Sequence, residues 1–137
     1  MLEGIDPLLT GELLWHLDAM GHSDAVVIAD AHFPAAASAR RLVTLPGTTT
    51  PAVVTAIRSV LPLDDAPALD LMRSADATVL PVQRELMDAA GVGDDETRFV
   101  DRFDYYELAR AAFVIVRTGE TRGYGNALLR KGLVTAP

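Results

Sequence analysis

The feature that most constrains this chain is the alternation of two hydrophobic periodicities. Residues 25–29 (AVVIA) and 113–116 (FVIV) are unbroken apolar runs of strand length, which is typical of strands buried on both faces. Elsewhere apolar residues recur at helical spacing, as at Leu9, Leu13 and Leu17. Alternating strands and helices predict an α/β fold, with residues 1–137 forming one open sheet of mixed or mostly parallel strands flanked by helices.

Local signals set the expected bounds of the first two helices. Thr10 is a favourable cap for the first helix, and Gly21 is expected to end it in a left-handed conformation. The second helix is expected to begin at Pro51 with Thr50 as its cap, because proline favours the first helical position. Its inward face is expected to include Val60.

The C-terminal half carries similar signals. Residues 81–90 are predicted to be helical and to be closed by Gly91. Asp104 and Glu107 have the spacing of a capping box, which predicts the start of another helix. Two more strands are expected, at 68–72 and 127–133.

Composition limits the classes of partner. Twelve Lys and Arg against 19 Asp and Glu give a net charge of −7, which disfavours binding to nucleic acid or to anionic membranes. The absence of cysteine excludes disulfides and thiolate metal sites. We find neither the roughly 20-residue apolar run of a membrane helix nor the pattern of a signal peptide. A cytoplasmic protein with no nucleic-acid or membrane partner is expected.

Three polar segments lie beside the predicted strands. His22 precedes the first strand, and histidine can exchange protons near neutral pH, although a loop histidine is by default a surface residue. Asp30 follows that strand and either accepts hydrogen bonds from a ligand or caps a turn. Tyr124 and Asn126 precede the last strand and either form a turn or face a polar ligand.

Motifs for metals and phosphate-bearing cofactors do not occur. The chain has no glycine-rich phosphate loop, and its histidines at 16, 22 and 32 form no HExxH. His32 is either a second acid or base, or an ordinary loop histidine. We therefore expect no cofactor and no metal site.

Motifs spread over nearly the whole chain resemble the RbsD/FucU family, in family order and at family spacing. They are LLTGELL at 8–14, MGHSD at 20–24, IADAHFP at 28–34, RFDYYE at 102–107, AAF at 111–113, TGE at 118–120, and YGN at 124–126 continuing to LRKG at 129–132. Any one motif is weak, but their succession is specific. Only the middle, roughly residues 74–97, is unlike the family.

The resemblance implies a cofactor-free enzyme that interconverts the α and β anomers of a free monosaccharide. By motif position His22 matches the proton donor, and the sugar-contacting positions are Asp30, Arg102, Tyr106, Tyr124, Gly125 and Asn126. Asp64 is a further candidate. The family also implies homo-oligomers, decamers among bacterial members, in which the YGN segment can complete a neighbour's pocket.

Arg102 followed by Phe resembles the fucose branch of the family. L-fucose is therefore the expected sugar. Ribose or another sugar is the nearest alternative, and a non-catalytic sugar-binding subunit is the alternative from another class. One departure lies beside the proton donor, where the family's usual glycine is Ser23.

Overall fold

The two apolar runs lie side by side in the interior of a six-stranded sheet. In the computed structural model, which describes residues 1–65 and 67–136, β1 (Ala25–Ala29) pairs in parallel with β5 (Val114–Thr118). The strand order is β2-β5-β1-β6-β3-β4. The remaining strands are β2 (Leu42–Leu45), β3 (Leu69–Met72), β4 (Thr97–Val100) and β6 (Ala127–Arg130).

Strand β6 sets the geometry of the site because it runs against its neighbours. It is antiparallel to both β1 and β3, whereas β1–β5, β2–β5 and β3–β4 are parallel. The amino end of β6 therefore lies at the same edge as the carboxyl ends of β1, β3 and β4. We call this the carboxyl edge of the sheet and the opposite one the amino edge.

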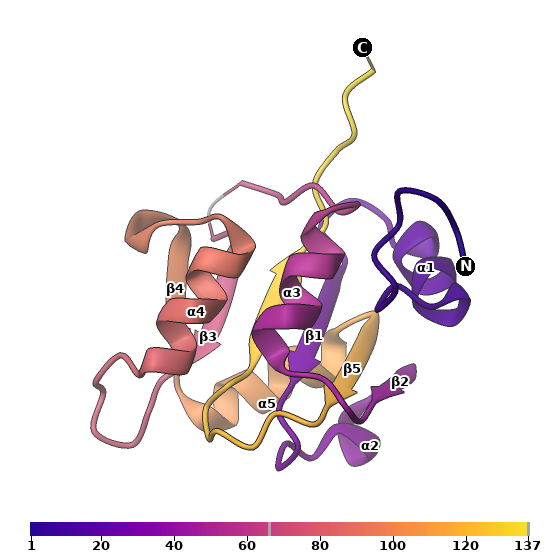
Figure 1. The fold of residues 1–137 in the computed structure, drawn as a ribbon. Coiled ribbons are helices and arrows are strands. Elements are labelled where there is room, and N and C mark those ends of the chain that lie inside the picture. Colours follow the sequence, from indigo (N-terminus) through magenta and orange to yellow (C-terminus); the bar gives the residue numbers. More distant parts are fainter. Residues whose placement is uncertain (66, 137) are drawn as a thin grey trace.

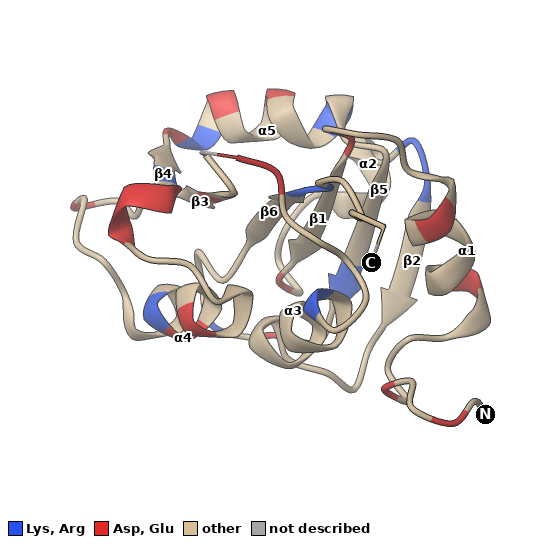
Figure 2. Cartoon of the chain, turned by 90° about the horizontal axis from the view of Figure 1, so that it is seen from above, with Lys and Arg blue, Asp and Glu red and all other residues tan. Residues whose placement is uncertain are grey.

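Helices cover both faces of the sheet (Figures 1 and 2). One face packs against α1 (Gly11–Ala19), α3 (Thr50–Arg58) and α4 (Pro81–Ala90), and the other against α2 (Ala35–Ser38) and α5 (Arg102–Ala111). A short 3-10 helix, Asp94–Glu96, precedes β4. Within the described ranges, no helix has the length and apolar character needed to cross a membrane. The predicted α/β class, with a mixed sheet, is confirmed.

Helix α1 begins as predicted but ends differently. The Thr10 hydroxyl accepts a hydrogen bond from the first turn. The predicted left-handed Gly21 is wrong, because the helix ends at Ala19 and its cap, Met20, has extended backbone, while Gly21 has no positive φ. Lys131 replaces a glycine cap, since its ammonium donates to two carbonyls of the helix end at 2.7 Å each. The left-handed residue of this loop is Ser23, with φ 68°.

Other expected bounds are also corrected. Thr49, not Thr50, caps α3, and Val60 lies beyond that helix and is 38% exposed. Helix α5 begins at Arg102, so Asp104 lies in its first turn and forms no capping box. Helix α4 and its left-handed Gly91 match the prediction.

The strand predictions hold for the interior of the sheet and fail at its edges. Strands β3 and β5 lie where they were expected, and β6 ends at Arg130, earlier than predicted. Strands β2 and β4 were not predicted. Both are edge strands with partly exposed residues, so neither carries a continuous apolar run.

Candidate active site

A cavity of about 230 Å³ opens at the carboxyl edge of the sheet. Five of the predicted site residues line it, although they come from β1, α5 and the segment before β6. The antiparallel direction of β6 brings these segments together. The lining residues are Asp30, His32, Phe33, Met72, Arg102, Tyr106, Gly123, Tyr124 and Asn126.

Asp30 is held rigidly at the end of β1. Its side chain accepts a hydrogen bond from the backbone N–H of His32 at 3.0 Å, and its own N–H donates to the Asn126 side-chain oxygen at 2.8 Å. Burial raises the pKa of Asp30, and backbone hydrogen bonds partly offset that effect. The Asn126 oxygen is thereby engaged, which leaves its amide N–H groups to donate toward the cavity.

Arg102 and Tyr106 form a second wall on α5. The Arg102 Nε donates to the Tyr106 hydroxyl at 2.9 Å, and this bond raises the pKa of Arg102. The Tyr106 ring meets Phe33 edge-on, with 5.5 Å between the ring centroids. The cavity therefore combines a guanidinium group with an aromatic surface, a combination suited to a ligand that has hydroxyls and apolar ring faces.

Gln83, on α4, supports the segment that precedes β6. Tyr124 has φ 58°, which is uncommon for a residue other than glycine. The fully buried Gln83 side chain donates to the Met72 carbonyl at 2.7 Å and lies 3.5 Å from the Tyr124 carbonyl. Gly125 does not line the cavity, and a Cβ there would approach the Arg122 carbonyl to 3.0 Å.

Sequence reasoning missed Gln83 and Met72. Neither lies in a recognisable motif. Met72 lines the cavity at the end of β3, and Gln83 of α4 lies behind it, bonded to the Met72 carbonyl. His32 lines the cavity, with its Nε2 3.2 Å from the Thr121 carbonyl oxygen. Among residues 1–65 and 67–136, no cluster of three His, Asp or Glu side chains is arranged to share a metal ion.

His22 lies elsewhere, at the amino edge of the sheet. Its Nε2 is 3.1 Å from Asp64 Oδ1, and the side chains of His22 and Asp64 are 52% and 20% exposed. The Ser23 hydroxyl donates to the other carboxylate oxygen, Oδ2, at 2.5 Å. These bonds hold the pKa of Asp64 at about 2, with the Ser23 hydroxyl as the largest cause, followed by the Asp65 N–H and His22.

Strand β1 separates His22 from the cavity of its own chain. His22 precedes the strand and Asp30 follows it, and five strand residues at about 3.3 Å each span about 16 Å. The structure thus brings together Asp30, Arg102, Tyr106, Tyr124 and Asn126, but not His22, within one chain.

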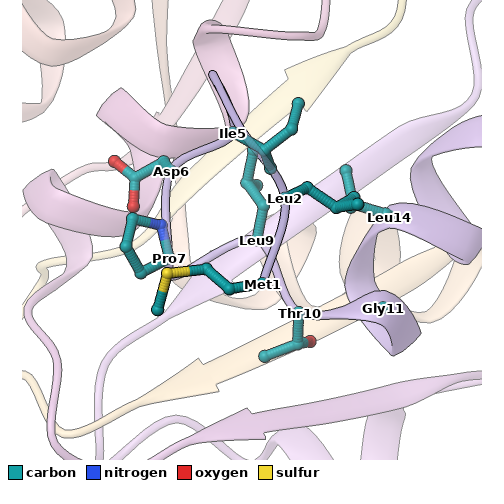
Figure 3. Close-up of a pocket in the computed structure, with 9 residues that line it drawn as sticks. All are labelled: Met1, Leu2, Ile5, Asp6, Pro7, Leu9, Thr10, Gly11 and Leu14. Atoms are coloured by element: carbon teal, nitrogen blue, oxygen red, sulfur yellow. The ribbon is translucent and has the colours of Figure 1, made fainter.

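A second cavity, of about 350 Å³, lies between the N-terminal segment and α1 (Figure 3). Its lining is mainly apolar. The two polar side chains in it are used locally, because Asp6 accepts from the Leu8 N–H and Thr10 from the Leu13 N–H. This cavity lacks the convergent polar groups of the one at the carboxyl edge.

Known proteins share both the sequence pattern and the fold of this chain. The model of the RbsD/FucU transport protein family matches residues 3–134. This chain belongs to that family. A fucose mutarotase from Danio rerio is 36% identical over 146 aligned residues, which cover 98% of this chain and 95% of the relative.

Solved structures agree with the assignment. The crystal structure of the Streptococcus pneumoniae fucose mutarotase in complex with L-fucose matches with a TM-score of 0.88 and 32% identity, covering 98% of this chain and 100% of that one. Bacillus subtilis RbsD complexed with D-ribose, 20% identical, matches with a TM-score of 0.80 over 98% of this chain and all of that one. At that identity the second match shows a shared fold. The family predicted from the motifs is confirmed.

Proposed function

We propose that this chain is a sugar mutarotase that interconverts the α and β anomers of L-fucose. The observation that carries the proposal is the cavity at the carboxyl edge, where a buried carboxylate, an amide, a guanidinium and two tyrosines converge. At about 230 Å³ it is smaller than the roughly 300–1,000 Å³ of drug-sized sites. That size suits a single sugar ring, and the family relationship supports the same reaction.

The reaction requires only proton transfers and rotation about one bond. A proton is delivered to the ring oxygen while another leaves the anomeric hydroxyl, so the bond between the anomeric carbon and the ring oxygen breaks and an aldehyde forms. Rotation of the aldehyde and reclosure on its other face give the other anomer, with both protons returned. A histidine can supply and recover the proton near neutral pH, and positioned proton transfer contributes about 10² to 10⁴ in rate.

In this proposal His22 exchanges the proton, and the cavity residues hold the sugar. Asp30 accepts from one sugar hydroxyl, Asn126 and the Arg102 guanidinium donate to others, and Tyr106 and Tyr124 pack against the ring. The Gly125 backbone supports the two flanking residues. Because His22 lies at the opposite edge from its own cavity, the active unit is a homo-oligomer in which one protomer's His22 completes its neighbour's site.

Two observations favour L-fucose over D-ribose. Phe33 and Met72 add apolar surface to the cavity, which suits the methyl group that fucose carries and ribose lacks. The identity to the L-fucose-bound relative is 32%, against 20% for the ribose-bound one. We also propose a cytoplasmic location, where a free monosaccharide meets the enzymes that metabolise it, and cell fractionation tests this.

Saturation-transfer NMR of the anomeric protons tests the activity directly. The protein should speed anomer exchange of L-fucose above the buffer rate and act more weakly on D-ribose and D-galactose. His22→Gln should lose on the order of 100-fold in rate, whereas His16→Gln, a control on α1 away from the cavity, should not. Sugar binding with exchange at the buffer rate would instead identify a non-catalytic binding subunit.

A further inference from the structure

Ser23 makes a side-chain hydrogen bond from a backbone conformation that is unfavourable for serine. With φ 68° it lies in the left-handed region, where glycine is at ease and a residue with a Cβ is strained. Its N–H is fixed by the Lys131 carbonyl at 2.9 Å. Its hydroxyl reaches Asp64 Oδ2 at 2.5 Å. The strained backbone thus aims the hydroxyl at the carboxylate that contacts His22.

The contact between His22 and Asp64 decides which ring nitrogen of His22 carries a hydrogen atom. An ionised carboxylate only accepts hydrogen bonds. A pKa of about 2 keeps Asp64 ionised at neutral pH. The His22 Nε2, 3.1 Å from Asp64 Oδ1, must therefore be the protonated nitrogen of the neutral ring. The other nitrogen, Nδ1, then has the lone pair that can take a proton.

We propose that Ser23 is a positioning residue for His22: its hydroxyl holds Asp64 so that the carboxylate fixes the Nε2–H form of the imidazole and leaves Nδ1 to exchange the proton with the sugar. This inference rests on the proposed function. Without the hydroxyl, Asp64 keeps the Asp65 N–H on Oδ1 but loses the bond to Oδ2. The carboxylate is then held less firmly, which weakens its control of the tautomer and orientation of the imidazole.

The surrounding charged groups are engaged elsewhere. Asp24, on the same loop, accepts from the Gly21 N–H at 2.7 Å. The Lys131 ammonium binds the carbonyls that end α1, and the Arg130 guanidinium binds Asp70. The Asp65 backbone N–H donates to Asp64 Oδ1 at 2.9 Å. Within the described residues, Ser23 is the side chain bonded to the second carboxylate oxygen of Asp64.

The test compares three variants at this one position. Ser23→Gly removes the hydroxyl and relieves the strained backbone, so its folding is not at risk. Ser23→Ala removes the hydroxyl and keeps the strain. Ser23→Asn tolerates the left-handed conformation and offers an amide donor in place of the hydroxyl. The readouts are the His22 tautomer, from ¹⁵N NMR of the neutral imidazole, and kcat and KM for anomer exchange.

We expect the wild-type ring to be in the Nε2–H form and the Gly and Ala variants to show a mixture of tautomers. Their kcat should fall on the order of tenfold with little change in KM, and Ser23→Asn should restore both readouts in part. An unchanged tautomer or an unchanged kcat in Ser23→Gly overturns the proposal. If the wild type accelerates no sugar, the proposed function fails, and the tautomer still decides whether Ser23 positions the ring.

Discussion

Mixing two inactive variants tests whether each site is built from two protomers. His22→Gln removes the imidazole that is proposed to exchange the proton, and Asp30→Asn removes the carboxylate of the cavity while keeping a similar shape. Each homogeneous variant should lose at least tenfold in anomer exchange, since hydrogen bonds to charged groups and proton transfer are each worth that much or more. Because β1 separates the two residues within one chain, the two defects lie in different halves of the proposed shared site.

The size of the recovery follows from counting. When both variants are co-expressed in equal amounts and assemble at random, about a quarter of the sites draw an intact His22 from one protomer and an intact Asp30 from its neighbour. Exchange should therefore recover to about a quarter of the wild-type rate, measured by saturation-transfer NMR on the purified mixed oligomer.

A matched control uses two defects in the same half. Asp30 and Arg102 line one cavity within one chain, so every cavity in a mixture of Asp30→Asn and Arg102→Met carries a defect, and no recovery is expected. If the mixture of His22→Gln with Asp30→Asn also stays inactive, the shared-site reasoning is refuted. A monomer in light scattering at working concentration would refute it as well.

Three further outcomes concern stability. Burial raises the folded pKa of Asp30. Its contribution to the free energy of unfolding is therefore fully present only below its unfolded pKa of about 3.9 and is lost as the pH rises. Asp30→Asn should be more stable than wild type to urea at pH 7, and the difference in stability should shrink under acid conditions. Asp70 is fully buried between two arginines, so Asp70→Ala should cost about 3 kcal/mol in urea unfolding. A Cβ at Gly132 would lie 2.3 Å from the Leu63 carbonyl oxygen, so Gly132→Ala should cost about 1–3 kcal/mol and shift the NMR signals of the adjoining Asp64; wild-type stability and spectra would contradict this.

The contribution of Asp64 to stability has a pH dependence of opposite sign to that of Asp30. The folded pKa of Asp64 is lowered to about 2, so its stabilising contribution is present above the unfolded pKa of about 3.9 and is lost as the pH falls toward 2. Urea unfolding of wild type and Asp64→Asn should therefore differ at pH 7 and converge as the pH falls through this window. A difference that stays constant down to pH 2 would contradict the hydrogen bonds that Ser23, Asp65 and His22 make to the Asp64 carboxylate.

Local sequence patterns were sufficient to predict the strands in the interior of the sheet and helix α4. The runs that became β1 and β5 are apolar at every position because both of their faces are covered, and α4 carries its own start and stop signals in Pro81 and Gly91. The edge strands β2 and β4 left no such signal, since their partly exposed residues do not form an apolar run. Gly21 was mispredicted because Lys131, distant in sequence, satisfies the carbonyls that a left-handed glycine would have served.

For the site, too, the sequence was enough to identify the residues but not to place them in space. The sequence by itself determined the family, the α/β class and the identity of the polar residues, because motif order and hydrophobic period are local properties of the chain. Only the tertiary structure decided that β6 runs antiparallel, which brings Tyr124 and Asn126 to Asp30 and leaves His22 with Asp64 at the opposite edge. Strand direction and pairing arise from contacts between residues far apart in sequence, and no local period encodes them.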